Sequence, residues 1–214
     1  MHVVCFDIDG TLVASAGFDG ELYQQAVQDV LGVNLNPDWS QYKNVTDSGI
    51  LEEILESIPD VEERTRLGRR VKSEFVNSTK QYFERNPRLI REIQGAKALV
   101  TTLREFPNVS ICIATGGWAE TATVKLRAIG IDPTKIPMAT SSDAVRRTDI
   151  MRLAESRAIS GSVTRRTYFG DGQWDKKAAA ELGYDFVAIG GCVDHHVAFQ
   201  DLQDLEAILG QLRV

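Results

Sequence analysis

The segment Val3-Val4-Cys5-Phe6-Asp7-Ile8-Asp9-Gly10-Thr11-Leu12 decides the interpretation of this chain. Its first half is a short, continuous apolar run, which is typical of a strand buried on both faces of a parallel sheet. Two aspartates and a glycine follow directly. In open α/β sheets, ligands bind beyond the carboxyl ends of the strands. The segment therefore predicts a buried strand with a candidate site at its end.

Four later runs are also short, continuous and apolar, and stretches with helical periodicity separate them. The expected strands are 3–9, 109–114, 136–140, 166–170 and 185–189. The helices expected in the same part of the chain are 118–129, 148–159, 174–182 and about 202–212. Strands that alternate with helices imply right-handed crossovers and helices on both faces of the sheet. The pattern predicts an α/β fold with a three-layer, Rossmann-like parallel sheet.

Residues from about 15 to 90 have a different pattern, because helical stretches follow one another there with no strand between them. These stretches are 21–31, 47–58 and 61–85, and Pro37, Pro59 and Pro87 separate them. Proline ends helices and marks turns. We therefore predict two domains. The α/β core consists of residues 1–14 and 91–214, and an inserted α-helical cap domain consists of residues 15–90.

Composition excludes several classes of protein. The 214 residues are 43% hydrophobic, and 24 basic and 30 acidic side chains give a net charge of −6. A mildly acidic chain is not typical of general nucleic-acid or anionic-membrane binders. The sequence has no run of about 18 apolar residues, so we expect no membrane span. The start of the chain does not resemble a secretory signal. Three cysteines, few and odd in number, favour a reducing compartment. We expect a cytoplasmic monomer or small homo-oligomer without nucleic-acid or membrane partners.

Carboxylates gather at two of the expected strand ends. Asp7 and Asp9 close the first strand, and Asp171 closes the fourth within the motif Gly170-Asp171-Gly172-Gln173-Trp174-Asp175. Converging carboxylates repel one another, and a divalent cation relieves that repulsion. Oxygen ligands favour Mg²⁺. Asp175 alone has a simpler interpretation, as a helix cap, but the joint occurrence of both motifs is specific.

Thr115-Gly116-Gly117 follows the second expected strand and precedes a helix. Free backbone N–H groups and the positive end of a helix dipole form an anion site at such a position. Glycine lets a phosphate approach closely, and the Thr115 hydroxyl can add a hydrogen bond. We therefore expect Thr115 and Gly116 to bind phosphate.

The three motifs together resemble the haloacid dehalogenase superfamily of phosphohydrolases. They are Asp7 to Leu12, the strand end at Thr115, and Gly170 to Asp175, and they occur in the family's order along the whole chain. The helical insertion after the first motif is similar to the cap of the phosphoglycolate-phosphatase and β-phosphoglucomutase type. The resemblance implies a Mg²⁺-dependent phosphatase that acts on a small phosphorylated metabolite.

The resemblance also implies roles for the four aspartates. Asp7 would attack phosphorus and form a phosphoaspartyl intermediate. Asp9 would act as general acid and then general base, and its backbone carbonyl would bind the metal. Asp7 and Asp171 would bind Mg²⁺ through their carboxylates, and Asp175 would hold the metal's waters from outside. Thr115 would take part in catalysis by holding the transferring phosphate.

One position departs from the family pattern. The family usually has a lysine near the start of the helix before the last motif, where this chain has Arg146 and Arg147. We expect Arg147 to replace it as a catalytic, phosphate-binding residue, with Arg146 and then Lys135 as alternatives. In the cap, Lys43 and Asn44 are candidate contacts to the substrate's leaving group.

Two other functions stay open at this point. A phosphomutase of the β-phosphoglucomutase type would use the same Asp7 and Asp9 but return the phosphoryl group to a sugar. A non-catalytic protein that binds a phosphorylated metabolite could share the fold, although all four carboxylates are present here.

Overall fold

A computed structural model describes residues 1–15 and 17–214; residue 16, which falls in the expected helical insertion, lies outside the described residues. Within them a six-stranded sheet has the order β3-β2-β1-β4-β5-β6, and every pairing is parallel. The strands are β1 (His2–Phe6), β2 (Val109–Ala114), β3 (Met138–Ala139), β4 (Arg165–Gly170), β5 (Asp185–Ile189) and β6 (Ala198–Phe199). Because β2 and β4 flank β1, the three carboxyl ends adjoin at a switch point. The predicted parallel α/β fold is confirmed.

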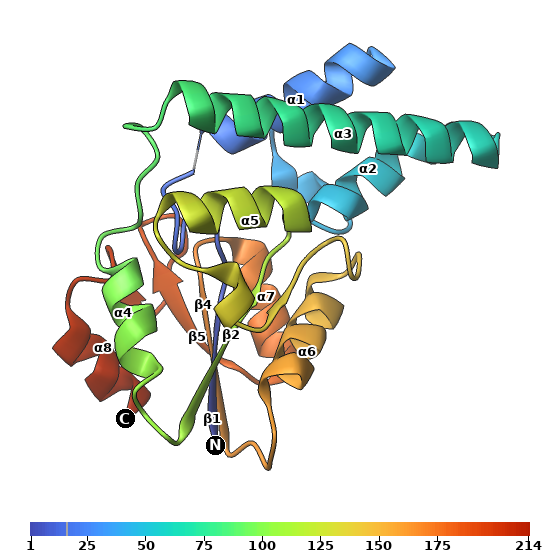
Figure 1. Cartoon of the computed structure of the whole chain (residues 1–214). Helices are drawn as coiled ribbons and strands as arrows, with labels where there is room; N and C mark the ends of the chain where they lie inside the picture. The colour runs from blue at the N-terminus through green and yellow to red at the C-terminus, as the bar shows by residue number, and fades with distance from the viewer. Residues whose placement is uncertain (16) are drawn as a thin grey trace.

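Helices cover both faces of the sheet (Figure 1). The side chains of β1 explain why, because Val4 and Phe6 point into one apolar cluster and Val3 and Cys5 into the other. The first cluster is completed by α4 (Ala96–Leu103), α5 (Ala119–Ala128) and α8 (Leu205–Leu212). The second is completed by α6 (Arg147–Ala158) and α7 (Gln173–Leu182). A strand buried on both faces needs the continuous apolar run that the sequence has.

Three further helices form a layer above the carboxyl ends of the strands (Figure 1). They are α1 (Phe18–Leu31), α2 (Asp47–Leu55) and α3 (Val61–Arg85), and we call them the helical layer. They share a third apolar cluster, in which Tyr23 and Phe75 pack against Trp118 at the start of α5. This cluster attaches the layer to the rest of the molecule. The division into domains at residues 15 and 90 stays a prediction.

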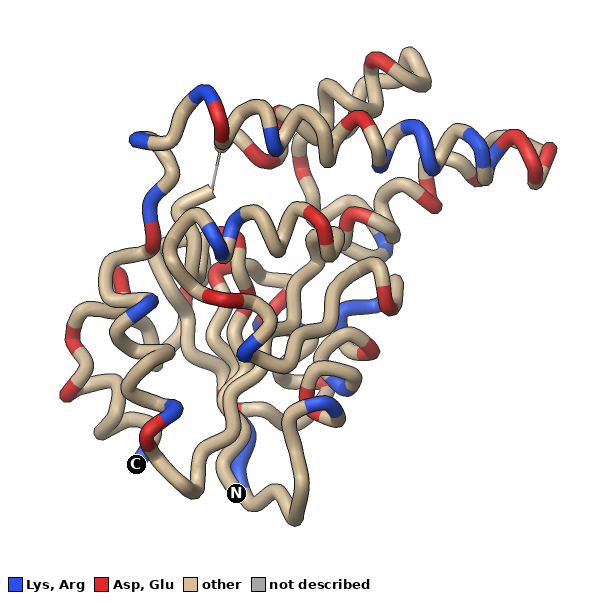
Figure 2. The backbone as a smooth tube through the Cα atoms, in the orientation of Figure 1, with Lys and Arg blue, Asp and Glu red and all other residues tan. Residues whose placement is uncertain are grey.

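Local signals explain the ends of these helices. The Thr46 hydroxyl accepts a hydrogen bond from the Gly49 N–H at the start of α2, and Asp60 accepts one from Glu63 at the start of α3. Both acidic and basic residues lie along α3 (Figure 2), as expected for a helix with one solvated face. Two 3₁₀ helices, η1 (Trp39–Gln41) and η2 (Pro133–Lys135), complete the elements.

The structure differs from the expectation mainly in short elements. The sequence did not predict α4, in which three β-branched residues in succession lower helix propensity. It did not predict the two-residue strand β6, and β3 is shorter than expected. The helix expected from residue 21 begins at Phe18. Among the described residues, no helix has both the length and the apolar character that crossing a membrane requires.

Candidate active site

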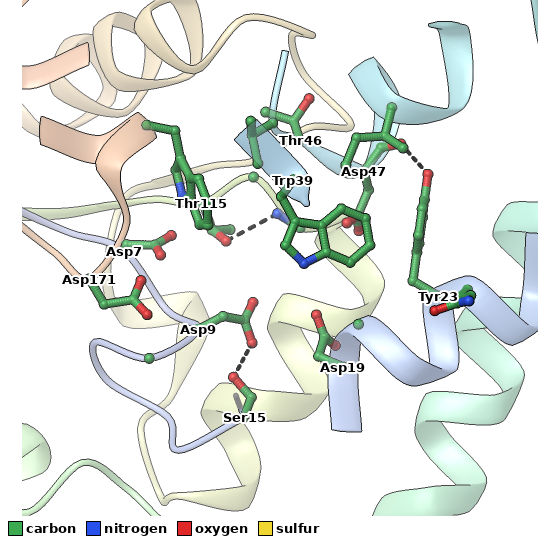
Figure 3. A pocket seen from close by; sticks show the side chains of 18 of the residues that line it. Asp7, Asp9, Ser15, Asp19, Tyr23, Trp39, Thr46, Asp47, Thr115 and Asp171 are labelled. Atoms are coloured by element: carbon green, nitrogen blue, oxygen red, sulfur yellow. Dashed lines mark hydrogen bonds between the residues drawn. The ribbon is translucent and has the colours of Figure 1, made fainter. Parts of the chain in front are cut away.

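A cavity of about 440 Å³ lies between the carboxyl ends of β1, β2 and β4 and the helical layer (Figure 3). Its size suits a small metabolite. The sheet side of its lining includes Asp7, Asp9, Thr115, Gly116, Arg147 and Asp171. The opposite side includes Asp19, Tyr23, Trp39 and Asp47. Motifs far apart in the sequence therefore face one cavity.

Three carboxylates converge at the sheet side. Asp7 follows β1, Asp171 follows β4, and Asp175 lies in the first turn of α7. One oxygen of each lies within 4.8 Å of the others. The Asp175 carboxylate also accepts hydrogen bonds from the Gly172 N–H at 3.0 Å and from the Tyr168 hydroxyl at 3.3 Å. Asp175 is therefore anchored from behind, whereas Asp7 and Asp171 face the cavity.

This cluster is short of positive charge. Burial, and then the neighbouring Asp175 carboxylate, raise the pKa of Asp7 well above its usual value, although Arg147 opposes the shift. The same two causes raise the pKa of Asp171 to about 7. In the described part of the chain, Asp7 Oδ1 is buried without a hydrogen-bond donor. An oxygen-only donor set with an unsatisfied buried oxygen fits a hard divalent cation such as Mg²⁺. The expected contribution of the Asp9 carbonyl stays a prediction.

Of the three basic candidates, only Arg147 lines this cavity. Its Nη1 lies 2.9 Å from Asp175 Oδ1 and 3.5 Å from Asp7 Oδ1, and its side chain is 10% exposed. Arg146 and Lys135 are 58% and 64% exposed and pair with surface carboxylates. Arg147 begins α6, so the helix start places its guanidinium beside the carboxylates. Its catalytic role stays a prediction.

The Thr115 turn is more crowded than expected. The Gly117 N–H donates to the Thr115 hydroxyl at 3.1 Å. At the start of α5, the Trp118 N–H donates to Asp47 Oδ2 at 2.9 Å, so a carboxylate from the helical layer already uses part of the anticipated anion site. At Gly116 a Cβ atom would lie 2.4 Å from Arg147 Nη2, so a larger residue there would displace the guanidinium. Phosphate binding at Thr115 and Gly116 stays a prediction.

A second charge cluster adjoins the first, and the sequence analysis did not predict it. Lys125 Nζ lies 2.6 Å from Asp9 Oδ1 and 2.6 Å from Asp19 Oδ1. Ser15 Oγ donates to the same Asp9 oxygen (Figure 3). The sequence did contain a signal, because Lys125 falls on the apolar stripe of its helix, three residues after Ala122.

Lys43 and Asn44 do not line the cavity that contains Asp7. They line a neighbouring cavity of about 260 Å³, together with Arg146 and Lys177. The helical layer presents the residues just after them, Val45 to Asp47, to the main cavity instead. A contact between Lys43 or Asn44 and a substrate stays a prediction. Asp19, Tyr23, Trp39 and Asp47 line the side of the main cavity formed by the helical layer, and the sequence analysis named none of them as cavity residues.

Comparisons with known proteins support the motifs. A family model described as haloacid dehalogenase-like hydrolase matches residues 4–189. No curated protein matches significantly. Among solved structures, a hydrolase from Pseudomonas syringae is 23% identical, with a TM-score of 0.75 and 99% of each chain covered.

Two other similar structures carry more specific names. CbbY from Rhodobacter sphaeroides in complex with phosphate is 16% identical, with a TM-score of 0.70 and 95% of each chain covered. A β-phosphoglucomutase from Clostridium difficile is 15% identical, with a TM-score of 0.68; the alignment covers 99% of this chain and 96% of the mutase. At these identities the likeness shows the fold.

Proposed function

Because the chain belongs to the haloacid dehalogenase-like hydrolases, we propose that it is a Mg²⁺-dependent phosphatase acting on a small phosphomonoester through a phosphoaspartyl intermediate on Asp7. One observation carries the proposal: the Asp7, Asp171 and Asp175 carboxylates converge beside Arg147 at the sheet side of a cavity of metabolite size. The helical layer over this cavity corresponds to the cap that the resemblance implies, and it would exclude water during the reaction.

The proposed reaction has two steps. Asp7 attacks phosphorus, the bond from phosphorus to the substrate's oxygen breaks, and Asp9 gives that oxygen its proton. Water then attacks the phosphorus of the acyl phosphate, Asp9 takes a proton from the water, and the bond to Asp7 breaks. Phosphate leaves, and both aspartates return to their first state. Asp9 lines the cavity on the side of Asp7, which supports this assignment.

Asp7 and Asp171 are the residues that would hold Mg²⁺, with Asp175 behind them. The ion would reduce the repulsion between an anionic nucleophile and an anionic phosphate. Arg147 would bind the phosphate oxygens, since its fork of N–H donors matches them. The Thr115 hydroxyl and the Gly116 backbone, which lies next to the Arg147 guanidinium, would also hold the phosphate.

The lining of the cavity favours a phosphatase over a sugar phosphomutase. A mutase must keep a molecule with two phosphates bound during its cycle, which calls for a second cationic site. Arg147 is the only basic side chain among the described residues that line the main cavity, and Asp19 and Glu21 lie on the leaving-group side. We therefore propose a substrate with one phosphate and an uncharged or cationic leaving group.

Phosphate release from a panel of phosphorylated metabolites tests the function, with and without Mg²⁺, and with Asp7→Asn as the inactive control. We expect Mg²⁺-dependent release from one class of phosphomonoester and none from the variant. Rapid isomerisation of a sugar phosphate with slow hydrolysis would establish the mutase. Tight binding of a metabolite without any turnover would establish a binding protein.

A further inference from the structure

Lys125 is a buried lysine that joins two parts of the molecule. It lies in α5, its side chain is 1% exposed, and its Nζ lies 2.6 Å from both Asp9 Oδ1 and Asp19 Oδ1. Asp9 follows β1 in the sheet region, and Asp19 lies in the first turn of α1 in the helical layer. The ammonium therefore bridges the end of the sheet and the layer that covers it.

A lysine at this position needs its two partners. Burial works against the charged ammonium, but the carboxylates of Asp19 and Asp9 outweigh it and raise the pKa of Lys125. Apolar residues often stabilise a protein core as well as or better than a buried ion pair. The neighbouring positions Ala122 and Leu126 are apolar. An apolar residue at position 125 could therefore stabilise the core as well, and what the lysine adds is that it fixes the positions of the Asp9 and Asp19 carboxylates.

The contacts of Asp9 are asymmetric, and this asymmetry suits proton transfer. Oδ1 accepts hydrogen bonds from both Lys125 Nζ and Ser15 Oγ. Oδ2 faces the turn after β2, since it lies 3.8 Å from the point where a Cβ atom would lie if Gly117 carried a side chain. Two donors on Oδ1 therefore leave Oδ2 directed at the turn where the phosphate is expected.

We propose that Lys125 is a positioning residue, which holds Asp9 by Oδ1 so that Oδ2 exchanges the proton in both steps of the reaction. This inference rests on the proposed phosphatase function and adds a residue to it. In the first step Oδ2 gives its proton to the leaving oxygen as the bond from phosphorus to that oxygen breaks. In the second step Oδ2 takes a proton from the attacking water. Lys125 neither gives nor takes a proton, and it touches no reacting atom.

A simpler role must be separated from this one. Through Asp19, Lys125 also ties the helical layer to the sheet region. If that tie were its whole contribution, loss of the lysine would weaken substrate binding equally for all substrates. If Lys125 positions Asp9, its loss acts mainly on substrates whose leaving oxygen needs a proton, because an alkoxide-like oxygen leaves poorly without one.

The experiment measures kcat/KM for aryl phosphates whose phenols range from acidic to weakly acidic: p-nitrophenyl, phenyl and p-methylphenyl phosphate. The variants are Lys125→Met, Lys125→Arg and Asp19→Asn. Lys97→Met is the matched control, since Lys97 is exposed on α4. For Lys125→Met we expect less than about tenfold loss with p-nitrophenyl phosphate and about 100-fold loss with p-methylphenyl phosphate. For Lys125→Arg we expect most of the activity with p-methylphenyl phosphate to be retained.

The other variants fix the interpretation. Asp19→Asn weakens the tie between Lys125 and the helical layer, so we expect KM to rise. The variant keeps the Lys125 contact to Asp9, so the dependence on the leaving group should stay that of the wild type. Equal losses with all three esters in Lys125→Met would overturn the inference while leaving the phosphatase intact. A wild type that hydrolyses none of them would instead reject the proposed function.

Thermal unfolding checks that each variant folds. If Lys125→Met does not fold, the double variant Lys125→Met/Asp19→Asn removes one charge of each sign and takes its place. The expectation for its leaving-group dependence is the same. If kcat/KM of the double variant, or of a folded Lys125→Met, depends on the leaving group as in the wild type, the positioning role is wrong.

Discussion

Two neighbouring charge clusters border one cavity, and they differ in how their charges are matched. The first contains Asp7, Asp171 and Asp175 around the single cation of Arg147. The second contains Asp9 and Asp19, which share Lys125 at 2.6 Å each. One buried oxygen in each cluster, Asp7 Oδ1 and Asp19 Oδ1, has no hydrogen-bond donor within the described residues. The Lys125 ammonium lies 2.6 Å from Asp19 Oδ1, whereas the Arg147 guanidinium lies 3.5 Å from Asp7 Oδ1.

The difference indicates which cluster suits a bound cation. A buried carboxylate without enough positive charge around it carries a free-energy cost, which a bound cation removes. The pKa of Asp171 is raised to about 7 for that reason, chiefly by burial and then by Asp175. In the second cluster the lysine supplies the charge from within the protein. We therefore interpret the first cluster as the metal and phosphate site and the second as the fixed frame for proton transfer.

The largest expected effect comes from the unmatched cluster. Asp171→Asn removes one of the two carboxylates that face the cavity there. We expect kcat to fall by about 100-fold or more, because even residues that only support metal ligands cost about 10- to 100-fold. The Mg²⁺ concentration for half-maximal activity should also rise. Titration of phosphate release with Mg²⁺ measures both quantities.

Glu105→Gln is the matched control, since Glu105 is exposed and lies between α4 and β2, near the amino end of the sheet. It should behave as the wild type. If Asp171→Asn left the Mg²⁺ dependence unchanged, this cluster would not be the Mg²⁺ site, and the contrast between the two charge clusters would be wrong.

The next effect tests the cation of the first cluster. Arg147→Ala should lower kcat/KM by about 10- to 100-fold, because the phosphate loses a bidentate, charge-assisted partner. Without Mg²⁺ the variant should also lose about 3–5 kcal/mol of unfolding free energy, since Asp175 stays buried without its counter-ion. Phosphate release and denaturant unfolding measure the two losses.

The adjacent Arg146→Ala is the control, because Arg146 is 58% exposed and pairs with Glu181 at the surface. Its activity and stability should change little. If the two substitutions had equal effects, the phosphate-binding role of Arg147 would be wrong, and Arg146 or Lys135 would become the candidates again.

The smallest effect concerns pH and the helical-layer side. Burial, and then the Asp19 carboxylate, raise the pKa of Asp47 from 3.8 to about 8. Between these values the folded protein keeps a proton that the unfolded chain has lost. This contribution to stability is therefore full below pH 4 and disappears as pH rises through 8.

Asp47→Asn lacks this titration. Its melting temperature should fall less than that of the wild type between pH 5 and 8.5, and the amide oxygen can still accept the Trp118 N–H bond. Thermal unfolding across that range provides the measurement. Parallel curves for the two proteins would show that Asp47 is ionised in the fold, and that the helical-layer side carries more negative charge than we infer.

The sequence predicted the sheet side of the cavity better than the opposite side, for a physical reason. Asp7, Thr115 and Asp171 each follow a buried strand, and parallel pairing brings strand ends to one edge whatever the details of packing. Local periodicity therefore sufficed to predict their proximity. Arg147 was predicted only through the resemblance, as a replacement for the family's lysine near a helix start, and its guanidinium does lie beside Asp7.

The helical-layer side depends on how three helices pack, which local sequence does not specify. Asp19 and Asp47 reach the cavity because α1 and α2 lie over the strand ends. Lys43 and Asn44 were named because caps of the resembled family close over the site, and the packing places them at the neighbouring cavity. Lys125 resembled an ordinary helix lysine until its buried face and its two distant partners were known.

The most direct measurement is the capture of the covalent intermediate. The protein is mixed with Mg²⁺ and acetyl phosphate, quenched in acid within milliseconds to seconds, and analysed by intact mass and peptide mapping. The account predicts one phosphoryl group, on the peptide that contains Asp7, and none in Asp7→Asn. Phosphoryl transfer to another residue, or rapid hydrolysis with no labelled protein at any time, would contradict it.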